Sequence, residues 1–159
     1  LGLLVLKNKL KLNYQSTKYF INQYFMPNIQ LKLTSQIKKF ANTSIDISDG
    51  LLADLDKMIN NQKLSYKIIL EDIPISNNLK KVLNLKKLPK INYISNGDDY
   101  QVLFTASKNK RGIIERISSN CKIKLTKIGS IESFSKKSSI IDDKNRTIII
   151  KNKGYFHKF

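Results

Sequence analysis

Residues 44–52, with the sequence SIDISDGLL, combine a short β-branched run, a tight acidic turn and the opening of a helix. Asp46 and Asp49 stand three positions apart on either side of Ser48, and Gly50 follows directly. At a strand-to-helix turn this predicts two hard oxygen ligands beside backbone N–H groups that face outward, which is what a magnesium–phosphate group needs. The simpler interpretation is that Asp49 only caps the helix and Gly50 only gives the turn its conformational freedom. Spacing alone slightly favours this simpler interpretation.

Length and composition indicate a globular chain in a reducing compartment. With 159 residues, 41% of them hydrophobic and 26% charged, the chain can form one domain, or one domain and part of another. The only cysteine, Cys121, excludes an internal disulfide and has no nearby histidine to suggest a zinc site. We therefore expect a cytoplasmic protein. The apolar run 1–6 is far shorter than the roughly 20 residues of a membrane-spanning helix, so no membrane association is expected.

The strong positive charge raises the question of nucleic-acid binding. Lys and Arg number 29 against 12 Asp and Glu, for a formal net charge of +17, and such an excess is common in nucleic-acid-binding proteins. Almost all of it is lysine, however, although arginine is the better phosphate ligand; the only arginines are Arg111, Arg116 and Arg146. The lysines are also spread along the whole chain. A solvated basic surface is the favoured interpretation, and a basic nucleic-acid-binding module is the alternative from a different class.

Apolar residues at helical spacing dominate the first forty positions. They predict three helices, the second capped by Ser16 or Thr17 and ended by Pro27, over residues 3–12, 16–25 and 29–41. Because the sequence starts without Met, we also expect the chain to begin inside a longer protein.

Strands and helices are interspersed through the middle of the chain, whereas three strand-like segments follow one another directly near its end. Residues 142–145 are typical of a hairpin turn between the last two. This order favours an α/β (α+β) fold with a mixed, largely antiparallel sheet and helices packed on it, over a purely parallel βαβ arrangement. No G-x-G-x-x-G or Walker-type motif occurs, so any nucleotide must be held by acidic, metal-mediated contacts. Strands are predicted over residues 43–47, 66–71, 100–105, 123–131, 139–141 and 147–150, and helices over 50–60, 77–85 and 108–119.

Two further stretches are candidates for a site. Residues 96–100, NGDDY, form a second acidic turn before a predicted strand. Alone it suggests a solvated loop, but a chain with only 12 acidic residues that pairs them at two such turns is more suggestive of a cation site. Residues 154–157, GYFH, either cover the edge of the core or form an aromatic lid that stacks on a flat substrate ring. His157, the only histidine, is expected to have no catalytic role.

Together these stretches resemble the thiamine-monophosphate kinase family, from the end of its first domain to its C-terminus. The resemblance covers essentially the whole chain in the family's order, and the two acidic runs, correctly spaced from one another, are its most specific part. The matching stretches are residues 2–4 (GLL), 24–27 (YFMP), 44–55 (SIDISDGLLADL), 73–76 (IPIS), 97–105 (GDDYQVLFT) and 154–157 (GYFH).

The resemblance implies a kinase that moves the γ-phosphate of ATP onto thiamine monophosphate, giving thiamine diphosphate, with Mg²⁺ required. By position, Asp46 and Asp49 match the family's magnesium ligands, and Ser48 matches a residue that contacts ATP. Asp98 falls where the family places an acidic substrate contact, and Tyr155 where an aromatic ring packs on the thiamine moiety. The implied fold is that of the C-terminal domain of the aminoimidazole ribonucleotide synthetase superfamily. No general base is needed for an acceptor phosphate that is already anionic, so no catalytic residue is assigned.

One departure from the family concerns its first domain, which carries further magnesium- and nucleotide-binding aspartates and builds the dimer. We expect residues 1–28 to be the helical end of that domain with a linker, and residues 29–159 to be the C-terminal kinase domain. A homodimer is expected only where the first domain is present, and the chain alone is expected to fold poorly or to bind ATP weakly. The alternative within the enzymes is another ATP-dependent, phosphate-handling member of the same superfamily.

Overall fold

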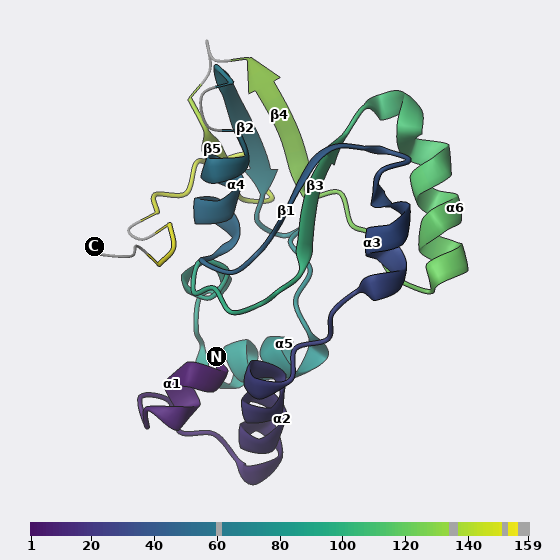
Figure 1. Ribbon diagram of the computed structural model, residues 1–159. Helices are drawn as coiled ribbons and strands as arrows, with labels where there is room; N and C mark the ends of the chain where they lie inside the picture. Colours follow the sequence, from purple (N-terminus) through teal and green to yellow (C-terminus); the bar gives the residue numbers. More distant parts are fainter. Residues whose placement is uncertain (60–61, 134–136, 151–152, 156–159) are drawn as a thin grey trace, which may run out of the picture.

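The computed structural model describes residues 1–59, 62–133, 137–150 and 153–155 (Figure 1). Its helices are α1 (Gly2–Leu6), α2 (Tyr14–Phe25), α3 (Leu31–Ile37), α4 (Leu51–Ile59), α5 (Asn77–Lys86) and α6 (Arg111–Cys121), with short 3₁₀ turns at Lys90–Asn92 and Lys108–Lys110. Its strands are β1 (Ala41–Asp46), β2 (Leu64–Ile69), β3 (Val102–Ala106), β4 (Gly129–Ser133) and β5 (Ser139–Ile141). None of the helices in these ranges has the length and apolarity needed to traverse a bilayer.

The described strands form two sheets. β1 pairs with β3 in antiparallel register, with Asp46 opposite Val102 at its end. β2 lies between β4, which is antiparallel to it, and β5, which is parallel to it. The predicted mixed, largely antiparallel α/β architecture is therefore confirmed, with the strands divided between two sheets.

Helix α4 is the centre of the main core. Its apolar residues are buried because they recur at the spacing that places them on one face of a helix. They pack against Tyr66 and Ile68 of β2 and Leu103 of β3, so one helix supports both sheets. Figure 1 shows α4 beside β2 and β5, with β1 leading toward its first turn. The buried residues of this cluster are Leu51, Leu52, Leu55, Met58, Ile59, Tyr66, Ile68, Ile73, Ile94, Leu103 and Ile140.

A smaller core joins α3 to α6 on the other side of β1 and β3 (Figure 1). It is built on three buried residues, Leu33, Phe40 and Ile117. The ring of Phe40 meets that of Phe104 edge to face at a centroid distance of 5.0 Å. Aromatic pairs in this geometry contribute beyond the area they bury, so Phe104 links the small core to the β1–β3 sheet.

The N-terminal helices lie together with α5 at one end of the molecule (Figure 1). The first predicted helix is shorter than expected, because the chain leaves α1 at Lys7 and Asn8 takes a left-handed φ of 53°. The predicted cap of α2 was wrong: Asn13 is the N-cap, and its side chain accepts the N–H of Ser16. α2 ends at Phe25 with Met26 as its C-cap, directly before the proline, as predicted.

The C-terminal part contains less strand than predicted. The hairpin turn is confirmed, since the Asp142 side chain accepts the N–H groups of Lys144 and Arg146. The strand predicted over residues 147–150 was wrong, because Thr147 makes only an isolated bridge to Ile141. The strand predicted over residues 123–131 begins only at Gly129. Its first part cannot follow β2 because it crosses from the small core to the main one, as the packing of Ile123, Leu125 and Ile128 shows.

Candidate functional site

The acidic turn after β1 is held from inside the protein by Asp54. This side chain is only 1% exposed and points back from the first turn of α4. Its Oδ2 accepts the backbone N–H groups of Ser48 and Asp49, each at 2.9 Å, and that of Gly50 at 3.1 Å. Three hydrogen bonds to one charged oxygen fix the backbone of the turn.

The outward-facing N–H groups predicted for this turn were therefore wrong. The N–H groups of residues 48–50 point inward to Asp54, and the two neighbouring N–H groups are also used. Ile47 donates to the carbonyl of Gln101 at 2.9 Å, and Leu51 donates to that of Ile94 at 3.1 Å. The turn consequently offers side-chain oxygens and no free backbone donors, which suits a cation better than a phosphate.

Lys57, one turn along α4, connects Asp49 to Asp54. Its ammonium forms an ion pair with Asp49 Oδ2 and donates to Asp54 Oδ1 at 2.9 Å. These hydrogen bonds, with Asp49 as the larger cause, raise the pKa of Lys57 above its usual value. The lysine side chain is 51% exposed, whereas that of Asp49 is 17% exposed. A positive charge is therefore already accommodated at the Asp49 carboxylate.

The second acidic turn lies against the first. The N–H of Asp98 donates to the carbonyl of Ser48, and the N–H of Tyr100 donates to that of Ile47, both at 2.8 Å. A Cβ added to Gly97 would collide with the Ser48 carbonyl, and the φ of this glycine is 71°. Only glycine allows the two turns to approach so closely.

The C-terminal segment reaches the same corner of the molecule. The N–H of Tyr155 donates to the Asp49 carbonyl at 2.8 Å, and the Lys153 carbonyl accepts the N–H of Ala53 at 3.0 Å. The side chain of Tyr155 remains 63% exposed, so its ring faces solvent beside the acidic turn. The lid residues Phe156 and His157 lie outside the described residues.

Acidic side chains of both turns act on the Tyr100 phenol. Asp98 is the largest cause that raises the pKa of the exposed Tyr100 phenol, and Asp46 acts in the same direction. Desolvation raises the pKa of Asp99 to about 6, and Asp98 adds to this rise. Asp46, which is exposed at the end of β1, and Asp98 therefore both lie near enough to Tyr100 to raise its pKa.

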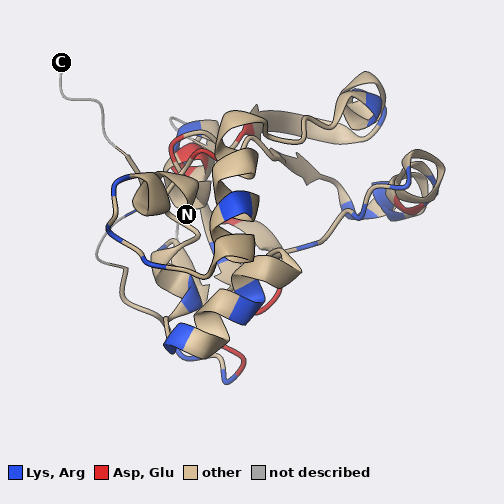
Figure 2. Ribbon diagram, turned by 90° about the horizontal axis from the view of Figure 1, so that it is seen from below, with Lys and Arg blue, Asp and Glu red and all other residues tan. Residues whose placement is uncertain are grey.

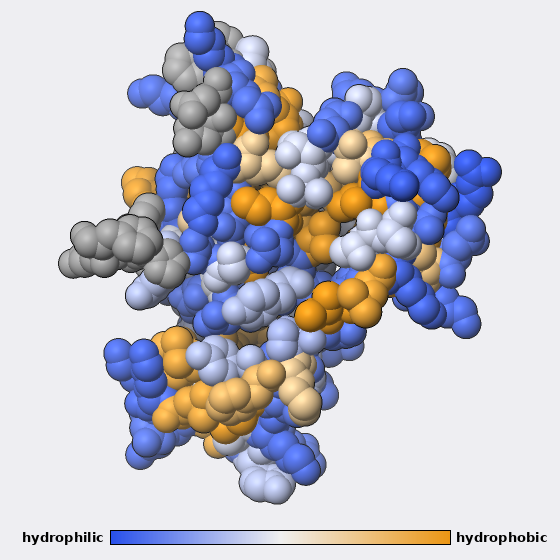
Figure 3. Space-filling view, in the orientation of Figure 1, coloured by the Kyte–Doolittle hydropathy of each residue, from blue (hydrophilic) through white to orange (hydrophobic). Residues whose placement is uncertain are grey.

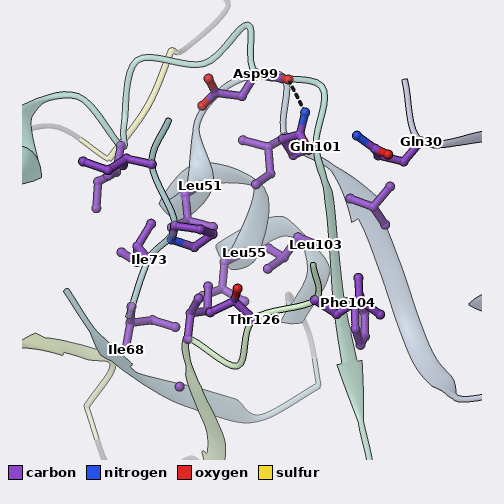
Figure 4. Close-up of a pocket in the computed structure, with 18 of the residues that line it drawn as sticks. Gln30, Leu51, Leu55, Ile68, Ile73, Asp99, Gln101, Leu103, Phe104 and Thr126 are labelled. Carbon is purple, nitrogen blue, oxygen red and sulfur yellow. Dashed lines mark hydrogen bonds between the residues drawn. The ribbon is translucent and has the colours of Figure 1, made fainter. Parts of the chain in front are cut away.

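A groove of about 1470 Å³ opens next to this corner. Figure 4 shows Asp99 and Gln101 at its mouth, where the Gln101 amide donates to the Asp99 carbonyl at 3.4 Å. The walls below are mainly apolar, with the Thr126 hydroxyl buried among them and without a hydrogen-bond partner. In Figure 3, apolar residues gather in the hollow between the sheets and the α3–α6 region. The groove is large enough for a small-molecule substrate.

The structure therefore brings three separate segments together. Ser48 and Asp49 lie in the first turn, Asp98 follows it through a backbone hydrogen bond, and the Tyr155 segment is bonded to Asp49. Sequence reasoning did not single out Asp54 and Lys57 as parts of this corner. Asp54 carried a signal, because it interrupts the apolar face of an amphipathic helix, and a charge on that face needs internal partners.

The carboxylate oxygens of the acidic turn are of the kind that binds Mg²⁺, and the contact between Lys57 and Asp49 supports this. An ammonium ion already rests against Asp49, so the position is suited to positive charge. Carboxylates are the ligands that Mg²⁺ uses in proteins, one or two at a time. Within the described ranges, no three His, Cys, Asp or Glu side chains are grouped closely enough to hold a metal by themselves. The Asp49 carboxylate thus already holds a positive charge, and the roles of Asp46 and Asp49 as magnesium ligands stay predictions.

Comparison with known proteins identifies the class first: the solved structures that this chain resembles have the aminoimidazole ribonucleotide synthetase-like fold. One, described as AaThiL complexed with AMPPCP and TMP, superposes with a TM-score of 0.74 at 27% identity, over 98% of this chain and 47% of that one. Thiamine monophosphate kinase from Aquifex aeolicus superposes with a TM-score of 0.69 at 27% identity, over 92% of this chain and 46% of that one. No protein-family model matches the sequence.

The curated relatives identify the protein more closely. The thiamine-monophosphate kinase of Buchnera aphidicola from Acyrthosiphon pisum is 32% identical over 158 residues, which are 98% of this chain and 48% of the relative. That of Buchnera aphidicola from Schizaphis graminum is 35% identical over 99% of this chain and 48% of the relative. The chain is thus a homologue of the C-terminal half of the thiamine-monophosphate kinases, and the predicted resemblance is confirmed. It spans about half the length of the curated relatives it matches.

Proposed function

We propose that this chain supplies the C-terminal part of an ATP-dependent thiamine-monophosphate kinase. The enzyme would transfer the γ-phosphoryl group of ATP to thiamine monophosphate and yield thiamine diphosphate. Similarity to kinases of this name over 98% of the chain supports the proposal, as does a related structure described as complexed with AMPPCP and TMP. The observation that carries it is the meeting of residues 46–50, 96–101 and 153–155 at one corner beside the groove.

Asp46 and Asp49 are the residues that would hold Mg²⁺. The metal ion supplies neutralisation of the charge on the transferring phosphoryl group. Because the N–H groups of residues 48–50 are bonded to Asp54, Ser48 would contact ATP through its hydroxyl and not through the backbone. The protein's contribution is therefore alignment and charge placement, which is most of what phosphoryl transfer requires.

Asp98 and Tyr155 are the residues that would contact thiamine monophosphate. The exposed ring of Tyr155 can pack on a flat heteroaromatic ring, and it is bonded through its backbone to the Asp49 turn. Asp98 is bonded through its own N–H to the carbonyl of Ser48. Both substrate-contacting residues would thus be held at fixed positions relative to the proposed metal ligands, as the alignment of the reacting groups requires.

Further carboxylates and the dimer contacts would come from the part of the relatives that this chain does not span. Residues 1–28 would be the end of that part, and residues 29–159 the kinase domain; a cytoplasmic location belongs to the same proposal. Nucleic acid is not expected as a partner, and Figure 2 supports this, since Lys and Arg lie on helices and loops in several parts of the molecule.

The proposal is tested by complementation. The purified chain is mixed, or coexpressed, with the separately produced N-terminal half of a Buchnera thiamine-monophosphate kinase, and thiamine diphosphate is measured with Mg²⁺–ATP. We expect turnover only in the combination. Asp49→Asn should lower this turnover by at least about 100-fold, whereas Asp72→Asn, an exposed carboxylate after β2, should leave it unchanged.

Near-normal turnover of Asp49→Asn would return Asp49 to the role of a helix cap. Turnover by the chain alone at the rate of a full-length relative would contradict the need for a second part. If Mg²⁺–ATP raises the melting temperature but thiamine phosphates do not, another ATP-dependent member of the superfamily is favoured.

A further inference from the structure

We infer that Lys57 is a built-in counter-ion of the proposed metal site, and that Mg²⁺ must displace its ammonium from Asp49 in order to bind. The inference rests on the proposed function, because it takes Asp49 as a metal ligand. It concerns a different residue, however, and assigns to Lys57 control over metal affinity.

The contacts of Lys57 place its charge in competition with a metal ion. Its Nζ forms an ion pair with Asp49 Oδ2, an oxygen of the proposed ligand. A divalent ion and an ammonium ion on the same carboxylate repel one another, so both cannot keep their full contact. Mg²⁺ also requires near-ideal octahedral geometry, which leaves little room for a lysine beside a shared oxygen.

Asp54 gives the displaced lysine a place to remain. Lys57 also donates to Asp54 Oδ1 at 2.9 Å, and Asp54 is fixed by three backbone N–H groups on its other oxygen. The lysine can therefore release Asp49 while staying paired with a carboxylate that does not move. With its side chain 51% exposed, it can do so without unpacking the core.

The two carboxylates that hold Lys57 are consequently unequal. Asp54 is 1% exposed and has its charge compensated by hydrogen bonds from the backbone of the turn. Asp49 is 17% exposed, and its side chain lies at the surface end of the network. An arriving cation therefore meets Asp49 first, and Lys57 sets how strongly that carboxylate attracts it.

The test is a Mg²⁺ titration of Lys57→Met, which keeps an unbranched side chain as far as the ε-carbon and removes the charged nitrogen. Thermal melts and isothermal calorimetry are run on the whole chain at constant ionic strength, with NaCl replacing MgCl₂ in the reference series. We expect the dissociation constant for Mg²⁺ to fall by roughly two- to five-fold, the range given by the strength of a partly exposed ion pair. Lys57→Gln, which keeps a neutral hydrogen-bond donor, should show the same direction if Lys57→Met does not fold.

Lys153→Met is the matched control. The Lys153 ammonium pairs at 2.7 Å with Asp56, a residue of the helix that also carries Lys57. Its side chain is 47% exposed, similar to that of Lys57, and its ion-pair partner is Asp56 and not Asp49. Its removal should lower the net charge by the same amount and leave the Mg²⁺ affinity unchanged. An equal gain in both variants would show a general charge effect and would overturn the inference.

The remaining outcomes separate this inference from the proposed function. If the wild-type chain and Lys57→Met bind Mg²⁺ equally, Lys57 is only a structural ion pair, and the proposed function stands. The titration is repeated with the N-terminal half from the complementation assay, and if Mg²⁺ has no effect on either protein in its presence, both the displacement and the assignment of Asp49 as a ligand fail. Turnover in the complementation assay decides the kinase proposal independently.

Discussion

The two acidic turns meet at one corner but are stabilised in different ways. The turn of residues 46–50 is anchored from below, because Asp54 holds three of its N–H groups from the first turn of a buried helix. In the turn of residues 96–100, the N–H groups of Asp98 and Tyr100 donate to backbone carbonyls of the first turn. The second turn is thus positioned by the first.

Backbone conformation separates the two turns further. Three residues of the second turn have left-handed φ values, 71° at Gly97, 57° at Asp98 and 51° at Tyr100. For the two residues other than glycine, this conformation costs about 1–2 kcal/mol each. Such backbone persists only where the surroundings determine it, and here the surroundings are the carbonyls of Ser48 and Ile47. Damage to the first turn should therefore spread to the second, and less in the opposite direction.

The largest effect is expected from removing the anchor of the first turn. Asp54→Ala should lower the free energy of unfolding by about 3–5 kcal/mol, because it leaves three backbone N–H groups, that of Gly50 buried, without their acceptor and removes one of the two carboxylates that contact Lys57. Urea denaturation measures the loss. Asp72→Ala, which removes an exposed carboxylate after β2, should change stability by no more than about 0.5 kcal/mol. A similarly small change for Asp54→Ala would show that the two turns are stabilised alike.

A smaller effect is expected from forcing the turns apart. Gly97→Ala should cost about 2–4 kcal/mol, since the new methyl group collides with the Ser48 carbonyl and a left-handed φ disfavours alanine. Thermal and urea unfolding report the cost.

Gly112→Ala is the control for this substitution. Gly112 lies in α6, and a Cβ there meets no atom within 4 Å. Because alanine favours helix over glycine, this variant should be unchanged or up to about 1 kcal/mol more stable. If both variants gained stability, the close approach of the two turns would be wrong.

The smallest effect concerns charge within the second turn. Asp98→Asn should lower the pKa of the Tyr100 phenol toward its ordinary value, because Asp98 is the largest cause of its rise. Loss of the neighbouring negative charge makes phenolate formation easier, so the titration moves to lower pH. NMR titration of the tyrosine ring carbons measures this, with Tyr14, which is 78% exposed on α2, as the reference. An unchanged pKa of Tyr100 in Asp98→Asn would show that the Asp98 carboxylate does not act on the phenol.

Much of this corner was predictable from the sequence, because local pattern determined it. The strand, turn and helix of residues 41–59 follow from a β-branched run, a glycine and an amphipathic stripe. The hairpin at residues 142–145 follows from turn chemistry. The corner itself required the resemblance, since no periodicity says that residues 49, 98 and 155 meet.

What sequence reasoning missed depends on tertiary contacts. The inward direction of the N–H groups of residues 48–50 depends on the Asp54 side chain; its place on the apolar face of α4 indicates burial, but the sequence does not say which groups it bonds. The strand predicted at residues 147–150 failed because an apolar run does not fix how far pairing extends: the segment meets β5 at Thr147 and Ile148 and forms no further ladder. The roles of Asp46, Ser48, Asp49, Asp98 and Tyr155 remain predictions, which the metal and turnover experiments address.

The bond from the Tyr155 N–H to the Asp49 carbonyl has a consequence for the order of folding during synthesis. A Cβ on Gly154 would lie 2.6 Å from the same carbonyl, so the tail passes tightly over the turn and helix α4. Residues 49 and 155 are separated by roughly a hundred positions, and a ribosome adds about 5–20 residues per second. For several seconds after Asp49 leaves the exit tunnel, the nascent chain therefore has its acidic turn but not the segment that closes over it. The corner would be completed last, after β4 and β5 have joined β2 and the rest of the main core has been synthesised.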